Sequence, residues 1–138
     1  MAAPAELYRD EFSTFTRDDQ RRLVEQRWTN LAMSEQQFRD RISKLATFLE
    51  RARVPNVLVD MAVISHTPSG DFEEWRQSQI IPRFNAAGVE RFALILPAGV
   101  PGTVESGAKP AIEGAVAKFP TAYFATRDRA LRWFESPD

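Results

Sequence analysis

The sequence predicts an α/β fold, with a four- to five-stranded mixed sheet in which a β-hairpin precedes a βαβαβ unit and helices pack on the sheet. Two continuously apolar segments, 56–64 and 91–97, are typical of parallel strands, because such strands are covered on both faces. The segment between them is helix-sized and ends at Gly88, which is long enough for a right-handed crossover. A short last strand over 121–125 and a terminal helix capped by Thr126 complete the predicted order.

The opening hairpin is predicted from residues 8–28, with a polar turn at 16–20. In its second strand, strict alternation places four side chains on one mixed face, namely Arg22, Val24, Gln26 and Trp28. A helix over 16–31 is the alternative, because Val24, Trp28 and Leu31 also share a helical face. We favour the hairpin because it gives the sheet its opening edge.

Two helices are predicted between the strands. The first begins after Ser34, since Gln37 three residues later completes a capping-box pattern. Its apolar stripe continues down to Arg53, and Pro55 stops the helix. The second opens at Asp71 and contains Pro82, which has no N–H to donate, so we expect a kink there. Residues 98–110 are rich in glycine and proline and predict an irregular loop, and 111–118 a short helix.

Length and composition indicate one soluble domain over residues 1–138, with residues 1–7 flexible. The absence of cysteine excludes disulfides, thiolate metal sites and thiol nucleophiles. No apolar run approaches the length of a membrane span, and the first residues lack the pattern of a signal peptide, so we expect a cytoplasmic location without membrane insertion. A net charge of -1 and scattered arginines argue against a nucleic-acid partner.

Short matches spread over most of the chain carry a resemblance to a known family. They are Leu58-Val59-Asp60, Trp75 followed by Ile81-Pro82-Arg83-Phe84, Ala87-Gly88-Val89 with Phe92-Ala93, and Tyr123-Phe124 before Ala130-Leu131-Arg132-Trp133-Phe134. With these residues the chain, from about residue 20 onward, resembles small bacterial proteins of the STAS/SpoIIAA-like group, also described as SEC14-like. The resemblance implies a mixed sheet of four or five strands with helices against it, and it assigns no activity, because a fold does not fix a function.

The resemblance also raises an expectation about regulation. In the anti-sigma-factor antagonists of the STAS family, a serine directly after an aspartate at a helix start is phosphorylated to switch partner binding. Here the turn runs Ser65-His66-Thr67-Pro68-Ser69-Gly70-Asp71, which has no Asp-Ser pair, and Ser69 is the nearest candidate. Because Asp71, Glu73 and Glu74 would repel a phosphate at that position, we predict that Ser69 is not a switch.

Few side chains predict chemistry. His66 is the only histidine, and its neighbour Ser65 is not placed by sequence adjacency to give up a proton to the imidazole, so we predict no catalytic residues, no metal site and no cofactor. Asp60 interrupts an apolar strand. It is either a site acid with a shifted pKa or a structural carboxylate satisfied by backbone amides or an arginine, and we favour the structural interpretation.

The predicted function is that of a non-enzymatic cytoplasmic module acting through protein–protein contacts, as a homodimer or with a regulatory protein partner. The alternative is a carrier or sensor of a small apolar or lipid-like ligand bound at the carboxyl ends of the central strands, where 65–70 and 98–102 emerge. A small enzyme using Asp60 and His66 is a third, weaker hypothesis. The surface predicted to bind a ligand or partner comprises Asp60, Ser65, His66, Ser69, Trp75 and Arg83.

Overall fold

The computed structural model describes residues 4–97 and 116–135, which form a six-stranded mixed sheet. The strands lie in sequence order and are β1 (Ala5–Arg9), β2 (Ser13–Asp18), β3 (Leu23–Trp28), β4 (Asn56–Asp60), β5 (Arg91–Ile95) and β6 (Thr121–Phe124). The first three strands pair antiparallel, and β3 to β6 pair parallel. This arrangement confirms the α/β class and the mixed sheet, which has one strand more than we expected.

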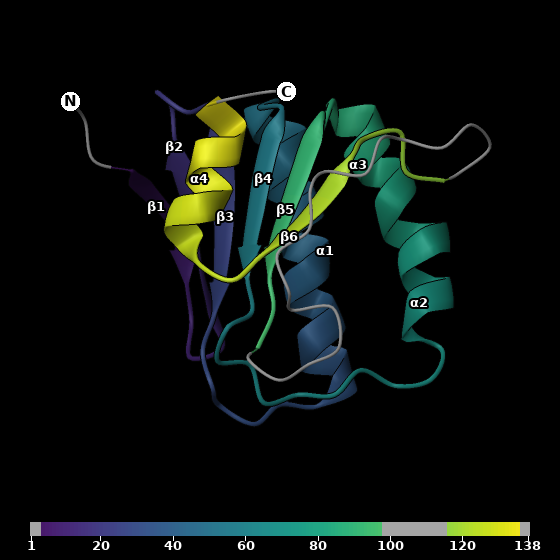
Figure 1. Ribbon diagram of the computed structural model, residues 1–138. Helices are drawn as coiled ribbons and strands as arrows, with labels where there is room; N and C mark the ends of the chain where they lie inside the picture. Colours follow the sequence, from purple (N-terminus) through teal and green to yellow (C-terminus); the bar gives the residue numbers. More distant parts are fainter. Residues whose placement is uncertain (1–3, 98–115, 136–138) are drawn as a thin grey trace.

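Helices cover both faces of the sheet unequally (Figure 1). One face, which we call the α1 face, is covered by α1 (Glu35–Ala52), α2 (Phe72–Trp75), the π-helical turn η1 (Arg76–Ile80) and α3 (Ile81–Ala87). On the other, the α4 face, α4 (Arg127–Glu135) is the one helix among the described residues. Alternating strand residues supply a separate apolar core to each face, so that Val57 and Val59 lie in the α1-face core and Leu58 lies in the α4-face core.

The N-terminal half confirms the hairpin and corrects the expected start. Residues 16–31 form no helix, and β2 and β3 pair in register from Asp18 opposite Leu23. The turn expected at 16–20 lies at 19–22 instead, because residues 16–18 continue strand β2. The first strand was not expected, since we predicted a flexible segment over 1–7, whereas Ala5–Arg9 pairs with β2. Four of its five residues are exposed, so it carries no apolar periodicity, and only Tyr8 packs inward, edge-on to Phe15 at 6.0 Å between ring centroids.

The predicted helix boundaries are largely confirmed. The Ser34 hydroxyl accepts a hydrogen bond from the Gln37 N–H at 3.1 Å, and the Gln37 side chain accepts one from the Ser34 N–H at 2.8 Å, which completes the capping box. Gly88 ends α3 with a φ of 92°, a conformation that favours glycine. The Thr126 hydroxyl accepts from the Arg129 N–H at 3.3 Å and caps α4.

Two central elements differ from the expected ones. The strand expected over 56–64 ends at Asp60, because the Asp60 side chain accepts a hydrogen bond from the Ala62 N–H at 3.1 Å and turns the chain. The helix between β4 and β5 is interrupted at η1, where the Ile81 N–H bonds to the Arg76 carbonyl, directly before Pro82. Of the segments expected over 98–118, only 116–118 lies within the described residues, and it is not helical.

Candidate ligand-binding pocket

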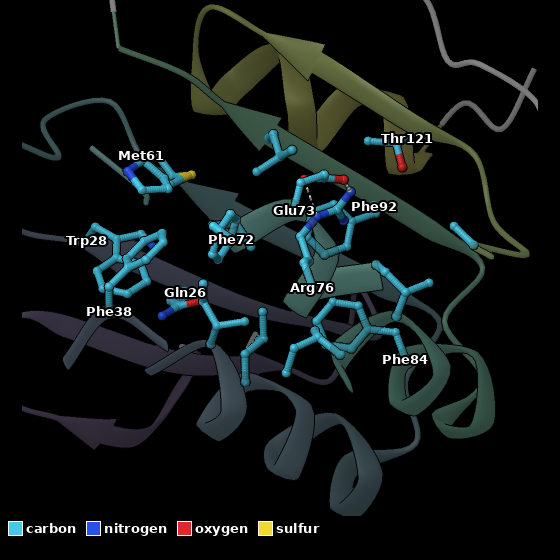
Figure 2. Close-up of a pocket in the computed structure, with 18 of the residues that line it drawn as sticks. Gln26, Trp28, Phe38, Met61, Phe72, Glu73, Arg76, Phe84, Phe92 and Thr121 are labelled. Atoms are coloured by element: carbon cyan, nitrogen blue, oxygen red, sulfur yellow. Dashed lines mark hydrogen bonds and ion pairs between the residues drawn. The ribbon is translucent and has the colours of Figure 1, made fainter. Parts of the chain in front are cut away.

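A pocket of about 310 Å³ lies between the α1 face of the sheet and the helices that cover it (Figure 2). Strands β3 to β6 supply one wall, and α1, α2, η1 and α3 supply the other. Most of the lining is aliphatic or aromatic and includes Phe38, Leu45, Val59, Phe72, Phe84 and Phe92. The wall formed by η1 and α3 contains the π-helical turn that interrupts the helix. Such turns are frequent at functional sites.

Two polar groups without partners lie in this apolar lining. Gln26 is 1% exposed, and neither its amide oxygen nor its amide nitrogen forms a hydrogen bond with any described residue. The indole Nε1 of Trp28, also in the lining, is equally buried and equally unpartnered among residues 4–97 and 116–135. The Oγ of Ser13, which pairs with Trp28 across β2 and β3, is also buried and unpartnered among the described residues, but Ser13 does not line the pocket. Buried polar groups are rarely left unbonded, and each costs about 1–3 kcal/mol when it is.

The side chains of Gln26 and Trp28 occupy one part of the pocket. Gln26 and Trp28 are alternate residues of β3 and therefore point to the same face of the sheet. In Figure 2 they lie with Phe38 at one end of the pocket, while Phe84 and Thr121 lie at the other end. The pocket thus combines a polar end with an apolar body, which is the usual arrangement of a small-molecule site.

An ion pair stands at the rim of the pocket. The Arg76 guanidinium donates to Glu73 at 2.6 and 3.1 Å, as the dashed lines in Figure 2 show. The hydrogen bond from Arg76 holds the pKa of the Glu73 carboxyl below its usual value. Because the Glu73 side chain is 62% exposed and that of Arg76 is 34% exposed, this pair lies toward solvent and each charge is balanced by the other.

The loop that precedes α2 is fastened to the start of α1. The Glu35 carboxylate accepts hydrogen bonds from His66 Nε2 at 2.8 Å, from the Ser69 N–H at 3.0 Å and from Arg39 at 2.7 Å. Burial raises the pKa of Glu35, but these hydrogen bonds outweigh it and lower the pKa to about 2. Since Pro68 of this loop lines the pocket, the contacts around Glu35 position part of the pocket wall.

Three of the residues predicted as a binding surface lie in this loop, and each has a partner within the protein. The Ser69 hydroxyl donates to Asp71 at 2.6 Å and accepts from Arg39 at 2.9 Å. The His66 ring packs on Phe38 at 4.7 Å between ring centroids. The Ser65 hydroxyl donates to the carbonyl of Asn30 at 3.1 Å. Each of these polar side chains therefore has a protein partner that holds the loop in place.

Two further predicted residues lie outside the pocket lining. Trp75 lies beneath the guanidinium of Arg39, 5.1 Å from the ring centroid, and packs in a tilted arrangement against Phe72, with 5.9 Å between ring centroids. Arg83 reaches from α3 to α1, where it donates to Glu50 at 2.6 and 3.0 Å. Arg83 joins the two helices on their outer side, and its hydrogen bonds lower the pKa of Glu50.

Asp60 lies on the other side of the sheet, on the α4 face. Its carboxylate accepts from the Ala62 N–H at 3.1 Å and lies 3.7 Å from Arg27 Nε. These are the backbone and arginine partners that the structural interpretation of Asp60 required. On the same face of β3, Glu25 is 6% exposed and accepts three hydrogen bonds from Arg127 at 2.8–3.1 Å.

The six residues predicted from the sequence therefore fall into separate regions rather than one site. The pocket lies between the α1 face and its helices and reaches the carboxyl ends of the strands at Trp28, Met61 and Leu94. We had expected a site outside those ends. The loop 98–102, expected to border it, lies outside the described residues. Sequence reasoning missed Gln26 as a site residue, although strand alternation already placed it on the face of Val24 and Trp28.

Within 4–97 and 116–135, no group of three or more histidine, cysteine, aspartate or glutamate side chains could hold a metal ion. The helices of the same residues include none with the length and apolarity needed to cross a membrane.

No family model fits the chain, and neither a curated protein nor a solved structure matches it. The resemblance to the STAS/SpoIIAA-like group therefore stays a prediction. The function has to be inferred from the chemistry of the pocket itself.

Proposed function

We propose that the protein is a non-enzymatic carrier or sensor of a small, mainly apolar ligand that binds in the pocket of the α1 face. The observation that supports this most directly is an apolar pocket of about 310 Å³ with the unpartnered amide of Gln26 in its lining. Ligand pockets have volumes of roughly 300–1,000 Å³ and mostly apolar walls with a few polar groups. A closed apolar cavity of roughly 150 Å³ already binds benzene, so this pocket has room for a substituted aromatic ring.

The ionisable groups of the lining favour binding over catalysis. Among the described lining residues they are Glu73, Arg76 and Tyr123. Glu73 and Arg76 bond to each other at the rim, so neither is poised to exchange a proton with a bound molecule. Gln26 and Trp28 are polar groups that do not titrate, and they can orient a ligand without reacting with it.

A titration with ethylbenzene tests the proposal, with methyl NMR signals as the readout. We expect the methyl signals of Met61 and Leu94, which line the pocket, to shift, and those of Leu131 in the α4-face core to stay unchanged. Native mass spectrometry of protein purified from its host is expected to show a bound small molecule. Equal shifts on both faces, or none at all, would contradict the proposal.

A pair of matched variants adds a control for the location. Leu94→Phe places a larger side chain in the lining and should weaken ethylbenzene binding. Leu7→Phe makes the same change on the exposed strand β1 and should leave the affinity unchanged. Circular dichroism checks that both variants are folded.

A module that acts through protein–protein contacts in the cytoplasm remains the second candidate function. Strand β1 supports it, because within the described residues its outer edge has no partner strand, and open strand edges can pair with another chain. Under this hypothesis a STAS/SpoIIAA-like homodimer should appear in sedimentation experiments across the micromolar range. A strict monomer, together with no regulatory partner recovered from the host, would contradict it.

A further inference from the structure

Building on the proposed function, we propose that the ligand carries an uncharged group with a hydrogen-bond acceptor and a donor side by side, and that this group binds at Gln26 and Trp28. A carboxamide, a lactam and a protonated carboxylic acid all have this pattern. The proposal names the chemical class of the ligand and assigns Gln26 as the residue that selects it.

The hydrogen-bonding capacity of the two side chains leads to this class. The Gln26 amide presents one acceptor, Oε1, and one donor group, Nε2, and both atoms are unpartnered among the described residues. A planar ligand group with its own adjacent donor and acceptor can form two parallel hydrogen bonds with them. A single hydroxyl oxygen cannot, because it would have to meet both amide atoms with poor angles.

Trp28 adds a requirement for a carbonyl. Its Nε1 only donates, so it needs an acceptor on the ligand. A carbonyl oxygen has two lone pairs and can accept from Gln26 Nε2 with one and from Trp28 Nε1 with the other. A ligand carbonyl flanked by an N–H or O–H therefore supplies a partner of the right kind for every unpartnered polar atom of Gln26 and Trp28.

The surroundings exclude a charged ligand group at this end of the pocket. The charged side chains of the described lining are Glu73 and Arg76, which lie toward solvent and neutralise each other. A carboxylate or an amidinium beside Gln26 would be buried without an opposite charge, which is strongly unfavourable. The amide of Gln26 itself is neutral, so it gives no preference to either sign of charge.

Aromatic side chains shape the space next to this polar end. Phe38 packs on Trp28 and on Phe72, in both cases at 5.1 Å between ring centroids. Both phenylalanines line the pocket, so a flat aromatic ring attached to the carbonyl group would meet ring faces and edges. Aryl amides are therefore suitable probes of the proposed ligand class.

A series of nearly isosteric probes tests the proposal by isothermal titration calorimetry at pH 7. The probes are benzamide, acetophenone, ethylbenzene, benzoate and benzamidine. We expect benzamide to bind about tenfold more tightly than acetophenone or ethylbenzene, since one or two net hydrogen bonds are gained. Benzoate and benzamidine should bind at least about tenfold more weakly than benzamide, because both are charged at this pH.

The variant Gln26→Met assigns the preference to one side chain. Methionine has a similar length and no hydrogen-bonding amide, so benzamide should lose its advantage of about tenfold while ethylbenzene binds as before. Gln37→Met, at the start of α1 and outside the pocket lining, is the matched control and should keep the wild-type order of affinities.

Each outcome bears on a different statement. If ethylbenzene binds and benzamide binds no better, the proposed ligand class is wrong and the apolar binding function stands. If benzoate or benzamidine binds most tightly, the inference of an uncharged group is wrong. If no probe binds, both the ligand class and the proposed function are contradicted.

Discussion

Glu25 and Gln26 are neighbours in β3, both almost fully buried, and they point to opposite faces of the same sheet. On the α4 face, Glu25 accepts three hydrogen bonds from Arg127 and lies 3.3 Å from Arg27. On the α1 face, the Gln26 amide has no partner among the described residues. The charged group is fully paired and the neutral one is left open, which is how a structural site and a binding site differ.

The packing of the two faces differs in the same sense. Where α4 lies on the sheet, the α4 face is closed by small residues, and Ala93, Ala122 and Ala130 are fully buried. Beside α4, this face has a hollow of about 240 Å³ whose lining is mainly polar and charged and includes Glu25, Arg27 and Arg127. The α1 face is built from larger side chains around a pocket of about 310 Å³. Close packing stabilises the fold, whereas a retained pocket with open polar groups lowers stability and is expected where a ligand binds.

The largest effect on stability is expected on the α4 face. Arg127→Leu leaves the Glu25 carboxylate buried with Arg27 as its remaining ion-pair partner among the described residues, and we expect the free energy of unfolding to fall by about 2–4 kcal/mol. This range is below that of a fully buried pair, because the Arg127 side chain is 37% exposed. Urea unfolding measures the change.

Two controls separate the ion pair from the loss of a helix residue. Arg132→Leu makes the same substitution at an exposed position of α4 and should change stability by less than about 0.5 kcal/mol. The double variant Glu25→Leu with Arg127→Leu should recover most of the loss, because no unpaired charge is left. Equal losses of stability in Arg127→Leu and Arg132→Leu would show that the ion pair between Glu25 and Arg127 does not stabilise the fold.

On the α1 face, removing a buried polar side chain should raise stability rather than lower it. Gln26→Met removes an unbonded buried amide, so we expect the ligand-free protein to become more stable by about 1–2 kcal/mol. Gln37→Met removes an amide that closes the capping box at 2.8 Å, and it should destabilise by about 0.5–1 kcal/mol. Thermal unfolding of both variants tests this, and a loss of stability in Gln26→Met would mean that the amide is satisfied in the native protein.

The elements with a strong local signal could be predicted from the sequence. Ser34, Gly88 and Thr126 act through groups a few residues away, and each works as its sequence context predicts. Strand β1 could not be predicted, because its exposed residues show no periodicity and its pairing with β2 is tertiary. The end of β4 was also hidden, since the turn depends on one hydrogen bond from the Ala62 N–H to Asp60.

The candidate site was harder to predict for a physical reason. Ser65, His66 and Ser69 attract attention as reactive residue types, yet their hydrogen bonds fasten a loop. Gln26 has no reactive group, and only its position beside Trp28 on a buried face makes it notable. Which buried polar groups lack a partner depends on the whole fold, so a sequence pattern cannot show it.

The stability of the protein should depend on pH through Glu35, which fastens the loop before α2. Its pKa in the folded protein, about 2, lies below the ordinary value of 4.5, so its carboxylate stabilises the fold above about pH 4.5. That contribution is lost as the pH falls from 4.5 toward 2. Glu35→Gln should therefore lower stability by about 1–2 kcal/mol at pH 7 and give a shallower acid denaturation curve.

Urea unfolding at a series of pH values measures this difference. Glu73→Gln is a suitable control, because the Glu73 carboxylate at the rim is more exposed and bonds to Arg76 and Gln77 within its own helical segment. If Glu35→Gln and the wild type lose stability in parallel between pH 4.5 and 2, the fastening of the loop by Glu35 is not electrostatic.

The smallest effect is expected at Ser69, where we predict that Ser69→Asp changes neither the fold nor the oligomeric state. A carboxylate there would be attracted by Arg39, whose guanidinium lies 2.9 Å from the hydroxyl, and repelled by Asp71, which lies 2.6 Å away, and by Glu35. These opposing terms at an exposed position should leave stability within about 0.5 kcal/mol of the wild type. Glu73 adds little repulsion because it is bonded to Arg76. Urea unfolding and sedimentation measure both properties, and phosphopeptide mass spectrometry on protein from its host that finds Ser69 substantially modified would contradict the prediction that this residue is not a switch.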